Sequence, residues 1–355
     1  MIDWTMAGRI AGGVAGGGPP TDPATGRLPE LTAEAAEQVC SYTGLEPATE
    51  IPAAEVVDRD GWTELNLRGM RPIEELLDPA GEGSLPSLLG PASAPLGAVA
   101  RAAVGPVVTV ELGLLTGYLA RRVLGQYEAS LLDPTAPTRL VYVGPNLSEA
   151  IEQLDAETDG LLRWVALHEV THAVQFAAVP WLREYLSGKV TALLAASTPS
   201  LPNGDRLRGL MADPAQIGRE LRDGGLFALV AGPAQRAILE DLQSAMAIVE
   251  GYAEHVMDAV GAQLDPEISQ LRQRLDRRRE SRGLLETIVA HVLGLEMKMR
   301  QYRLGKQFCD AVVAAEGIEG LNHVWSAAGA LPSSAEIDHP GRWMERVAGE
   351  RATAA

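Results

Sequence analysis

The sequence is poor in cysteine, in aromatic residues and in positive charge. Only two cysteines, Cys40 and Cys309, occur in 355 residues, so the chain has no disulfide framework, as is usual in a reducing compartment. Lys and Arg number 30 against 47 Asp and Glu, which gives a net charge of −17. This charge repels a phosphate backbone and an anionic membrane surface. We therefore expect no nucleic-acid partner.

The sequence also lacks the features of a signal peptide and a long apolar run free of charge. The N-terminal residues include an acid, Asp3, and their apolar stretch is broken by glycines. Two apolar segments, 94–125 and 161–179, are long enough to test as membrane spans, but both contain ionisable residues, such as Arg101 and Glu111 in the first. Charges at the centre of a span cost roughly 2.5–3.5 kcal/mol each. We expect buried helices of a cytoplasmic protein, without stable membrane insertion.

What the sequence has in quantity is helical pattern between stretches rich in glycine and proline. Such stretches, at 16–30, 78–95, 198–205 and 330–341, have the composition of loops. Three segments between them keep apolar residues at helical intervals and end at glycine: 31–44, with Thr32 as a candidate cap, 234–261 and 282–317. Thr138–Leu147 is rich in β-branched and aromatic residues, which indicates a strand. The pattern predicts a mainly α fold with long helices and a small β element.

Two histidines and a glutamate lie inside one of the apolar segments. In WVALHEVTHAVQF, His168 and His172 are four residues apart and therefore share a helix face, about 6 Å apart at Cβ. Each imidazole can give one nitrogen to a single Zn²⁺, and Glu169 is placed to take a proton from a water that the ion activates. Ordinary core histidines would leave three polar groups on one buried helix unexplained. The spacing H-E-x-x-H thus predicts two metal ligands and a general base.

A catalytic zinc site normally has three protein ligands, so one more must come from elsewhere in the chain. The extended motif that supplies a third histidine is not present, because Gln175 and Ala178 stand at the required positions. The downstream helical segment 247–261 concentrates the acidic and histidine candidates, which are Glu250, Glu254, His255 and Asp258. We expect Zn²⁺ as the cofactor, with its third ligand from this segment.

Helical geometry separates these candidates. Glu250 and Glu254 share a face, whereas His255 lies about 140° around the axis from Glu250. If Glu250 is the ligand, Glu254 lies one turn away and can accept a hydrogen bond from the second nitrogen of a ligand histidine. The small Gly251 then allows the motif helix to approach closely. Two alternatives stay open: Glu254 as the ligand with Asp258 behind it, and a site with a third histidine or with two ligands.

Several stretches of the sequence resemble a known group of metalloproteins. VALHEVTHAV resembles the motif helix of thermolysin-type enzymes, and EGYAE resembles the element by which many gluzincins, aminopeptidases included, provide a glutamate ligand. A longer resemblance runs through VYVGPNL, VPWL, EGYAEHVMD, GLEMKMRQYRLGKQF and LPSSAEIDHPGRWMERV, and covers most of 141–347. The chain thereby resembles a family of bacterial, largely actinobacterial, zincin-like hydrolases or zinc-dependent metalloproteases. Some members of that family are labelled as associated with deazaflavin coenzyme biosynthesis.

The resemblance implies a zincin-like, predominantly helical fold in which His168, His172 and Glu250 bind the metal and Glu169 is the base. We expect two parts packed as one unit. Residues 1–137 form an N-terminal helical part with a flexible start rich in glycine and proline, and residues 138–348 form the zincin-like metal-binding part. The chain departs from better-known gluzincins in the long stretch between His172 and Glu250, whose loop at 199–214 is either a substrate lid or inert.

These observations predict a zinc-dependent hydrolase, in first place a metallopeptidase, that acts on a peptide or a small-molecule substrate. The alternatives are a catalytically inactive zincin-like scaffold that binds a protein partner, and a metallohydrolase of a small metabolite. Hydrolysis also needs a donor that stabilises the tetrahedral intermediate. The sequence offers five candidates without selecting one: Tyr252, His255, His291, Tyr302 and His323. It does not set the oligomeric state.

Overall fold

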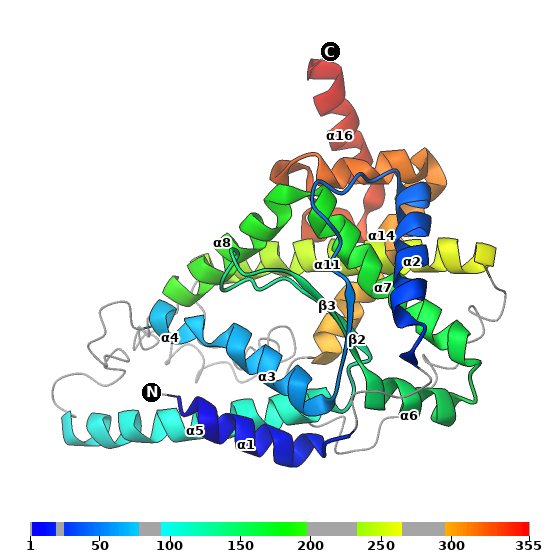
Figure 1. Ribbon diagram of the computed structural model, residues 1–355. Coiled ribbons are helices and arrows are strands. Elements are labelled where there is room, and N and C mark those ends of the chain that lie inside the picture. Colours follow the sequence, from blue (N-terminus) through cyan, green and yellow to red (C-terminus); the bar gives the residue numbers. More distant parts are fainter. Residues whose placement is uncertain (1, 19–24, 78–93, 197–232, 265–294, 355) are drawn as a thin grey trace.

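The chain folds into a mainly helical structure around a small sheet, as the computed structural model shows for residues 2–18, 25–77, 94–196, 233–264 and 295–354 (Figure 1). This confirms the predicted fold class. The strands are β1 Ala54–Val57, β2 Gly125–Glu128 and β3 Arg139–Val143. The α-helices are α1 Trp4–Ala15, α2 Leu28–Thr43, α3 Arg59–Met70, α4 Pro72–Leu77, α5 Ala94–Ala120, α6 Gly144–Leu154, α7 Thr158–Ala178, α8 Pro180–Ala196, α11 Pro233–Leu264, α14 Leu295–Leu321, α15 Ser334–Asp338 and α16 Pro340–Ala354. Two short 3₁₀ helices, η3 Asn322–Trp325 and η4 Ala328–Ala330, follow α14.

The sheet has three strands in the order β1-β3-β2. β1 pairs with β3 in parallel, and β2 pairs with β3 antiparallel. β1 comes from the part expected to end at residue 137, whereas β3 comes from the part expected to begin at residue 138, so the sheet joins chain from both sides of that position. β2 is an edge strand, and it lies against α7.

The central strand β3 is buried on both faces, and its alternate residues belong to different hydrophobic clusters. Leu140 and Tyr142 belong to the main core, which also contains buried apolar residues from α2, α7, α11 and α14. Val141 and Val143 belong to a smaller cluster with Trp62 of α3 and Ala120 of α5. This division follows from the two-residue period of a strand. The sheet therefore separates the motif helix α7 on one face from α3 and α5 on the other.

Helix α5, which contains much of the first apolar segment, packs against α1 at the base of the molecule (Figure 1). The two backbones approach so closely that a Cβ on Gly113 or Gly117 would lie 2.8 Å or 2.5 Å from the carbonyl oxygen of Ala7 or Ala11. Pro106 lies inside α5. Across the described ranges, no helix combines the length and the apolar character that crossing a bilayer requires.

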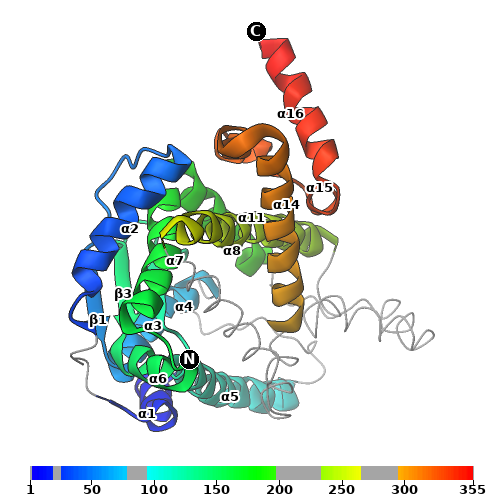
Figure 2. The ribbon, with the colours of Figure 1, turned by 90° about the vertical axis from the view of Figure 1, so that its right-hand side faces the viewer.

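The long helices α11 and α14 cross in close contact, and α16 projects away from them (Figures 1 and 2). Glycines allow the close approach of α11 to α14. A Cβ on Gly251 would lie 2.3 Å from the carbonyl carbon of Gly305, and a Cβ on Gly305 would lie 1.9 Å from the carbonyl oxygen of Ala247. The expectation that Gly251 faces the motif helix is therefore wrong: it allows α14 to approach instead.

Several element boundaries differ from the expectations, for identifiable reasons. α2 begins at Leu28 with a proline in its first turn, so Thr32 lies inside the helix and its hydroxyl bonds the Tyr142 hydroxyl at 3.0 Å. The strand predicted over 138–147 ends at Val143, because Gly144 and Pro145 begin α6. Gly44 ends α2 in the left-handed conformation, as predicted.

Two segments of the C-terminal region also differ from the predicted loop and the predicted helix end. The loop expected over 330–341 contains α15, which begins with a capping box between Ser333 and Glu336. Gly317, with φ of 74°, kinks α14 instead of ending it. The predicted helical residues 282–294, and the loop at 199–214, lie outside the described part of the chain.

We expect Gly305→Ala to destabilise the fold, because the new methyl group cannot fit against the backbone of Ala247. Overpacking of a buried contact costs about 1–3 kcal/mol, and occasionally more. Gly188→Ala is the matched control, since Gly188 lies inside α8 with open space around it and alanine favours a helix by about 1 kcal/mol. Denaturant midpoints measure both changes. Similar midpoints for the two variants would contradict the close contact of α11 with α14.

Candidate metal centre

Helix α7 carries the motif through the core of the protein. It begins after Glu157, whose side chain accepts hydrogen bonds from the amides of Asp159 and Gly160, and it ends two residues before Pro180. Glu157 therefore caps the helix, and Pro180 begins the next helix, α8. Most residues from Leu161 to Ala177 are buried, as is typical of a helix surrounded by other elements. Any polar group on such a helix needs a partner.

Three predicted ligand residues meet where α7 lies beside α11. Nε2 of His168 lies 4.0 Å, and Nε2 of His172 lies 3.8 Å, from Oε2 of Glu250. The potential ligand atoms all lie within 4.8 Å of one another. Searched over the described residues alone, the chain contains no other group of three or more such side chains. The structure thus brings together the two histidines of the motif and the carboxylate favoured as their companion.

The donor set fits a zinc ion. Tetrahedral zinc sites have bonds of about 2.0–2.2 Å, which places their donor atoms about 3.3–3.6 Å apart. The distances of 3.8 and 4.0 Å to Glu250 exceed this by about half an ångström, which small side-chain rotations close. The His168 and Glu250 side chains keep exposed fractions of 26% and 23%. A catalytic site keeps a fourth position open, and the partial exposure of these two side chains is compatible with such a position.

Glu169 is held beside these ligands by the edge strand. It is only 8% exposed, and its Oε2 accepts a hydrogen bond of 2.8 Å from the backbone amide of Tyr127 in β2. Burial raises the pKa of Glu169 to about 7, although His172 and the Tyr127 amide act in the opposite sense. Gly125 leaves room for this side chain, because a Cβ there would lie 2.7 Å from Cγ of Glu169. A carboxyl group whose pKa lies near neutrality is suited to a general base.

We expect the metal-free protein to lose stability as Glu169 ionises. Its pKa is raised from 4.5 to about 7 in the folded state, so the stabilisation from its protonated form is complete below about pH 4.5 and is lost as the pH rises through 7. The shift corresponds to roughly 3 kcal/mol. Urea unfolding of chelator-treated wild type and Glu169→Gln, at about pH 5 and pH 8, isolates this contribution. A difference between the two proteins that is the same at both pH values would contradict the assignment.

Two contacts of the centre were not identified from the sequence. Gln175 is fully buried. Its side chain contacts the ring of His172 and donates a hydrogen bond to the carbonyl of Val249 on α11. Its signal was present, because it is a polar residue one turn after His172 in an otherwise apolar run. The amide of Tyr127 carries no sequence signal, since any residue other than proline supplies the same group.

Of the alternative third ligands, His255 and Asp258 interact with other residues, and Glu254 stays a prediction. His255 has both ring nitrogens occupied: Nε2 lies 2.8 Å from the Tyr42 hydroxyl, and Nδ1 lies 2.7 Å from Oδ1 of Asp310. The alternative in which this histidine completes the site is therefore wrong. Asp258 forms an ion pair of 3.1 Å with Lys306. Glu254 is half-buried, and its role as a hydrogen-bond acceptor for a ligand histidine stays a prediction.

The candidate donors for a tetrahedral intermediate are only partly accounted for. Tyr252 is fully buried and its hydroxyl donates to Oδ1 of Asn322 at 2.7 Å, which assigns it to the core. His255 belongs to the polar contacts with Tyr42 and Asp310. His323 lies in η3, whereas His291 and the side chain of Tyr302 lie outside the described residues.

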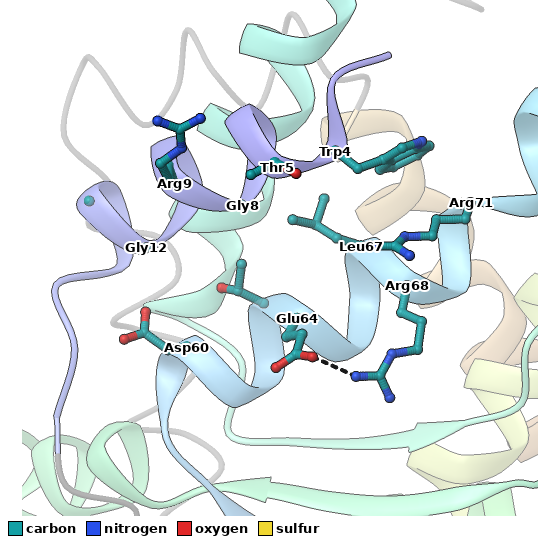
Figure 3. A pocket seen from close by; sticks show the side chains of 12 residues that line it. Trp4, Thr5, Gly8, Arg9, Gly12, Asp60, Glu64, Leu67, Arg68 and Arg71 are labelled. Atoms are coloured by element: carbon teal, nitrogen blue, oxygen red, sulfur yellow. Dashed lines mark hydrogen bonds and ion pairs between the residues drawn. The ribbon is translucent and has the colours of Figure 1, made fainter. Parts of the chain in front are cut away.

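A pocket of about 460 Å³ lies away from this centre, between α1 and α3 (Figure 3). Trp4 and Leu67 face it from the two helices, and Arg71 lies beside them at one end. Arg68 is paired with Glu64 at 2.6 Å. None of the motif residues or Glu250 lines the pocket. It is therefore separate from the metal centre.

Comparisons with known proteins agree with this geometry. A family described as zincin-like metallopeptidase matches residues 2–344. A search of curated proteins finds no match. Among solved structures, the chain is similar to a crystal structure from Chloroflexus aurantiacus, described as a candidate hydrolase with a novel fold. The two share 30% sequence identity with a TM-score of 0.67, over 98% of this chain and 99% of the other.

Proposed function

The chain belongs to the zincin-like metallopeptidase family, and from this premise we propose that it is a zinc-dependent hydrolase that cleaves peptide bonds. The resemblance seen in the motif helix is thereby confirmed at the level of the family. The observation that carries the proposal is the meeting of His168, His172 and Glu250 beside a buried carboxylate, Glu169. These four residues supply three ligands and one base.

The proposed chemistry divides between the metal and the chain. When bound, zinc polarises a carbonyl oxygen and lowers the pKa of a water. His168 and His172 would hold the ion through Nε2, and Glu250 would hold it through a carboxylate oxygen. Glu169, fixed by the Tyr127 amide, accepts the proton of the attacking water and passes it to the leaving amine. The positive charge of the ion favours the ionised form of Glu169, which is the form that can accept a proton.

The edge strand β2 supports a peptide as the substrate. The amide of Val143 donates a hydrogen bond of 3.0 Å to the carbonyl oxygen of Leu124, so the alternate residues Gly125 and Tyr127 direct their amides and carbonyls away from β3. That edge is the one at which Glu169 meets Tyr127. An extended peptide that adds to this edge by main-chain hydrogen bonds would use groups other than the Tyr127 amide, which already donates to Glu169, and its amide bonds would lie beside the base.

The inactive-scaffold alternative fits the centre less well. A structural zinc site is closed by four protein ligands. Here the described residues provide three, and His168 and Glu250 are partly exposed. A scaffold also has no need for a buried carboxylate beside the ligands, and burying one is unfavourable. Hydrolysis of a small metabolite uses the same machinery, so only a substrate screen separates it from peptide cleavage.

Incubating the zinc-loaded protein with a peptide library tests the proposal, with cleavage products mapped by mass spectrometry. A parallel panel of small amides and esters serves as the comparison. We expect metal-dependent peptide cleavage that a chelator abolishes and zinc restores. Turnover confined to the small amides and esters would replace the peptidase proposal by the metabolite alternative, and the absence of turnover in both panels would favour the scaffold.

A further inference from the structure

Gln175 joins the two helices that carry the candidate ligands. It lies on α7 one turn after His172 and is fully buried. Its Oε1 lies 3.0 Å from Nδ1 of His172, and its Nε2 lies 3.1 Å from the carbonyl oxygen of Val249 on α11. Val249 is the residue before Glu250. A single side chain thus contacts one histidine of the centre and the backbone next to its carboxylate.

The chemistry of these contacts fixes where the protons lie. The carbonyl of Val249 can only accept a hydrogen bond, so the amide nitrogen of Gln175 must face it. The oxygen of the same amide then faces His172, and this oxygen can only accept. Nδ1 of His172 must therefore carry a hydrogen. In the neutral ring this leaves the lone pair on Nε2, the nitrogen that lies 3.8 Å from Glu250.

We propose that Gln175 is a positioning residue that holds His172 in the Nδ1–H tautomer and ties α7 to α11 beside Glu250. The inference rests on the proposed function, since it takes the three ligand residues as a zinc site. A neutral imidazole otherwise exists in two tautomers, only one of which presents Nε2 to the ion. Gln175 removes that choice before the metal arrives. It also fixes the ring orientation, because a rotated ring would leave the buried amide oxygen without a partner.

The tautomer can be measured in the metal-free wild type, without any substitution. Nitrogen-15 chemical shifts of the His172 ring are recorded at about pH 8, above the usual pKa of a histidine of about 6.5. We expect a protonated Nδ1 and an unprotonated Nε2. A ring with its hydrogen on Nε2, or one that exchanges between both forms, would overturn the proposal.

Two variants test the consequence for the metal. Gln175→Leu removes both hydrogen bonds at nearly constant volume, and we expect zinc to bind about 10- to 100-fold more weakly. Thr171→Val is the matched control on the same helix, because Thr171 is fully buried and its hydroxyl donates to the carbonyl of Leu167 at 2.6 Å, within the same helix. We expect its zinc affinity to equal that of wild type. Equal affinities for the leucine variant and this control would contradict the proposal.

A third variant and a cleavage assay separate the positioning role from the hydrolase function. Gln175→Glu retains an acceptor for His172, so we expect the Nδ1–H signal to persist in this variant. Loss of that signal would contradict the orientation of the contact. If the tautomer and affinities behave as expected but no substrate is cleaved, the positioning role stands and the proposed hydrolase function fails. If wild type cleaves peptides but Gln175→Leu binds zinc as tightly as wild type, the hydrolase function stands and the positioning role fails.

Discussion

Glu169→Gln is expected to reduce kcat by about 10²- to 10⁴-fold while zinc stays bound, which is the range that a positioned acid or base contributes. Glutamine keeps the size of the side chain, and its amide oxygen can still accept the hydrogen bond from Tyr127. It cannot take a proton from water. The three candidate ligands are untouched by this change. Steady-state kinetics on a peptide found in the library screen, together with metal analysis of the same preparation, measures both effects.

The effect of Glu169→Gln is compared with that of the same substitution at a carboxylate outside the metal centre. Glu152→Gln is suitable, because Glu152 is an exposed residue of α6 and the substitution makes the same chemical change. We expect its kcat and zinc content to match those of wild type. If the Glu169 variant turned over peptide as fast as this control, the general-base role would be lost. Loss of zinc from the Glu169 variant would instead indicate that the carboxylate helps to hold the ion.

Local spacing made the motif predictable. His168, Glu169 and His172 lie within two turns of one helix, so their relative placement follows from helix geometry alone. The same reasoning favoured Glu250 over His255, and the structure brings Glu250 to the histidines while His255 contacts Tyr42 and Asp310. Periodicity and chemistry sufficed here because each choice lay along a single helix.

Contacts between distant elements were less accessible. The sequence indicated that Gly251 allows a close approach, but not that α14 is the neighbour, because the same small residue suits any partner helix. The parallel pairing of β1 with β3 joins strands of four and five residues, too short for their pattern to specify a partner. Gln175 acquires its role only through the carbonyl of Val249, which the sequence does not place beside it.

Glu250→Ala is expected to lower zinc affinity by more than about 100-fold, beyond the loss typical of a residue that acts through a ligand. Oε2 of Glu250 is the atom that both histidines approach, at 4.0 and 3.8 Å, so the variant leaves two imidazoles without the carboxylate. Hydrolysis should disappear with the metal. Binding of zinc at 100 times its dissociation constant stabilises a folded protein by about 2.7 kcal/mol. Zinc should therefore raise the melting temperature of wild type but not of this variant.

Two companion variants on α11 decide between the possible registers of the third ligand. Glu240→Ala removes an exposed carboxylate, and we expect wild-type zinc binding. Glu254→Ala removes the carboxylate one turn beyond Glu250. If Glu254 accepts a hydrogen bond from a ligand histidine, its removal lowers zinc affinity by an intermediate factor of about 10 to 100. The expected order of loss is Glu250, then Glu254, then Glu240. If removing Glu254 abolished zinc binding while removing Glu250 preserved it, the ligand would be Glu254, and the placement of α11 against α7 would differ by one turn.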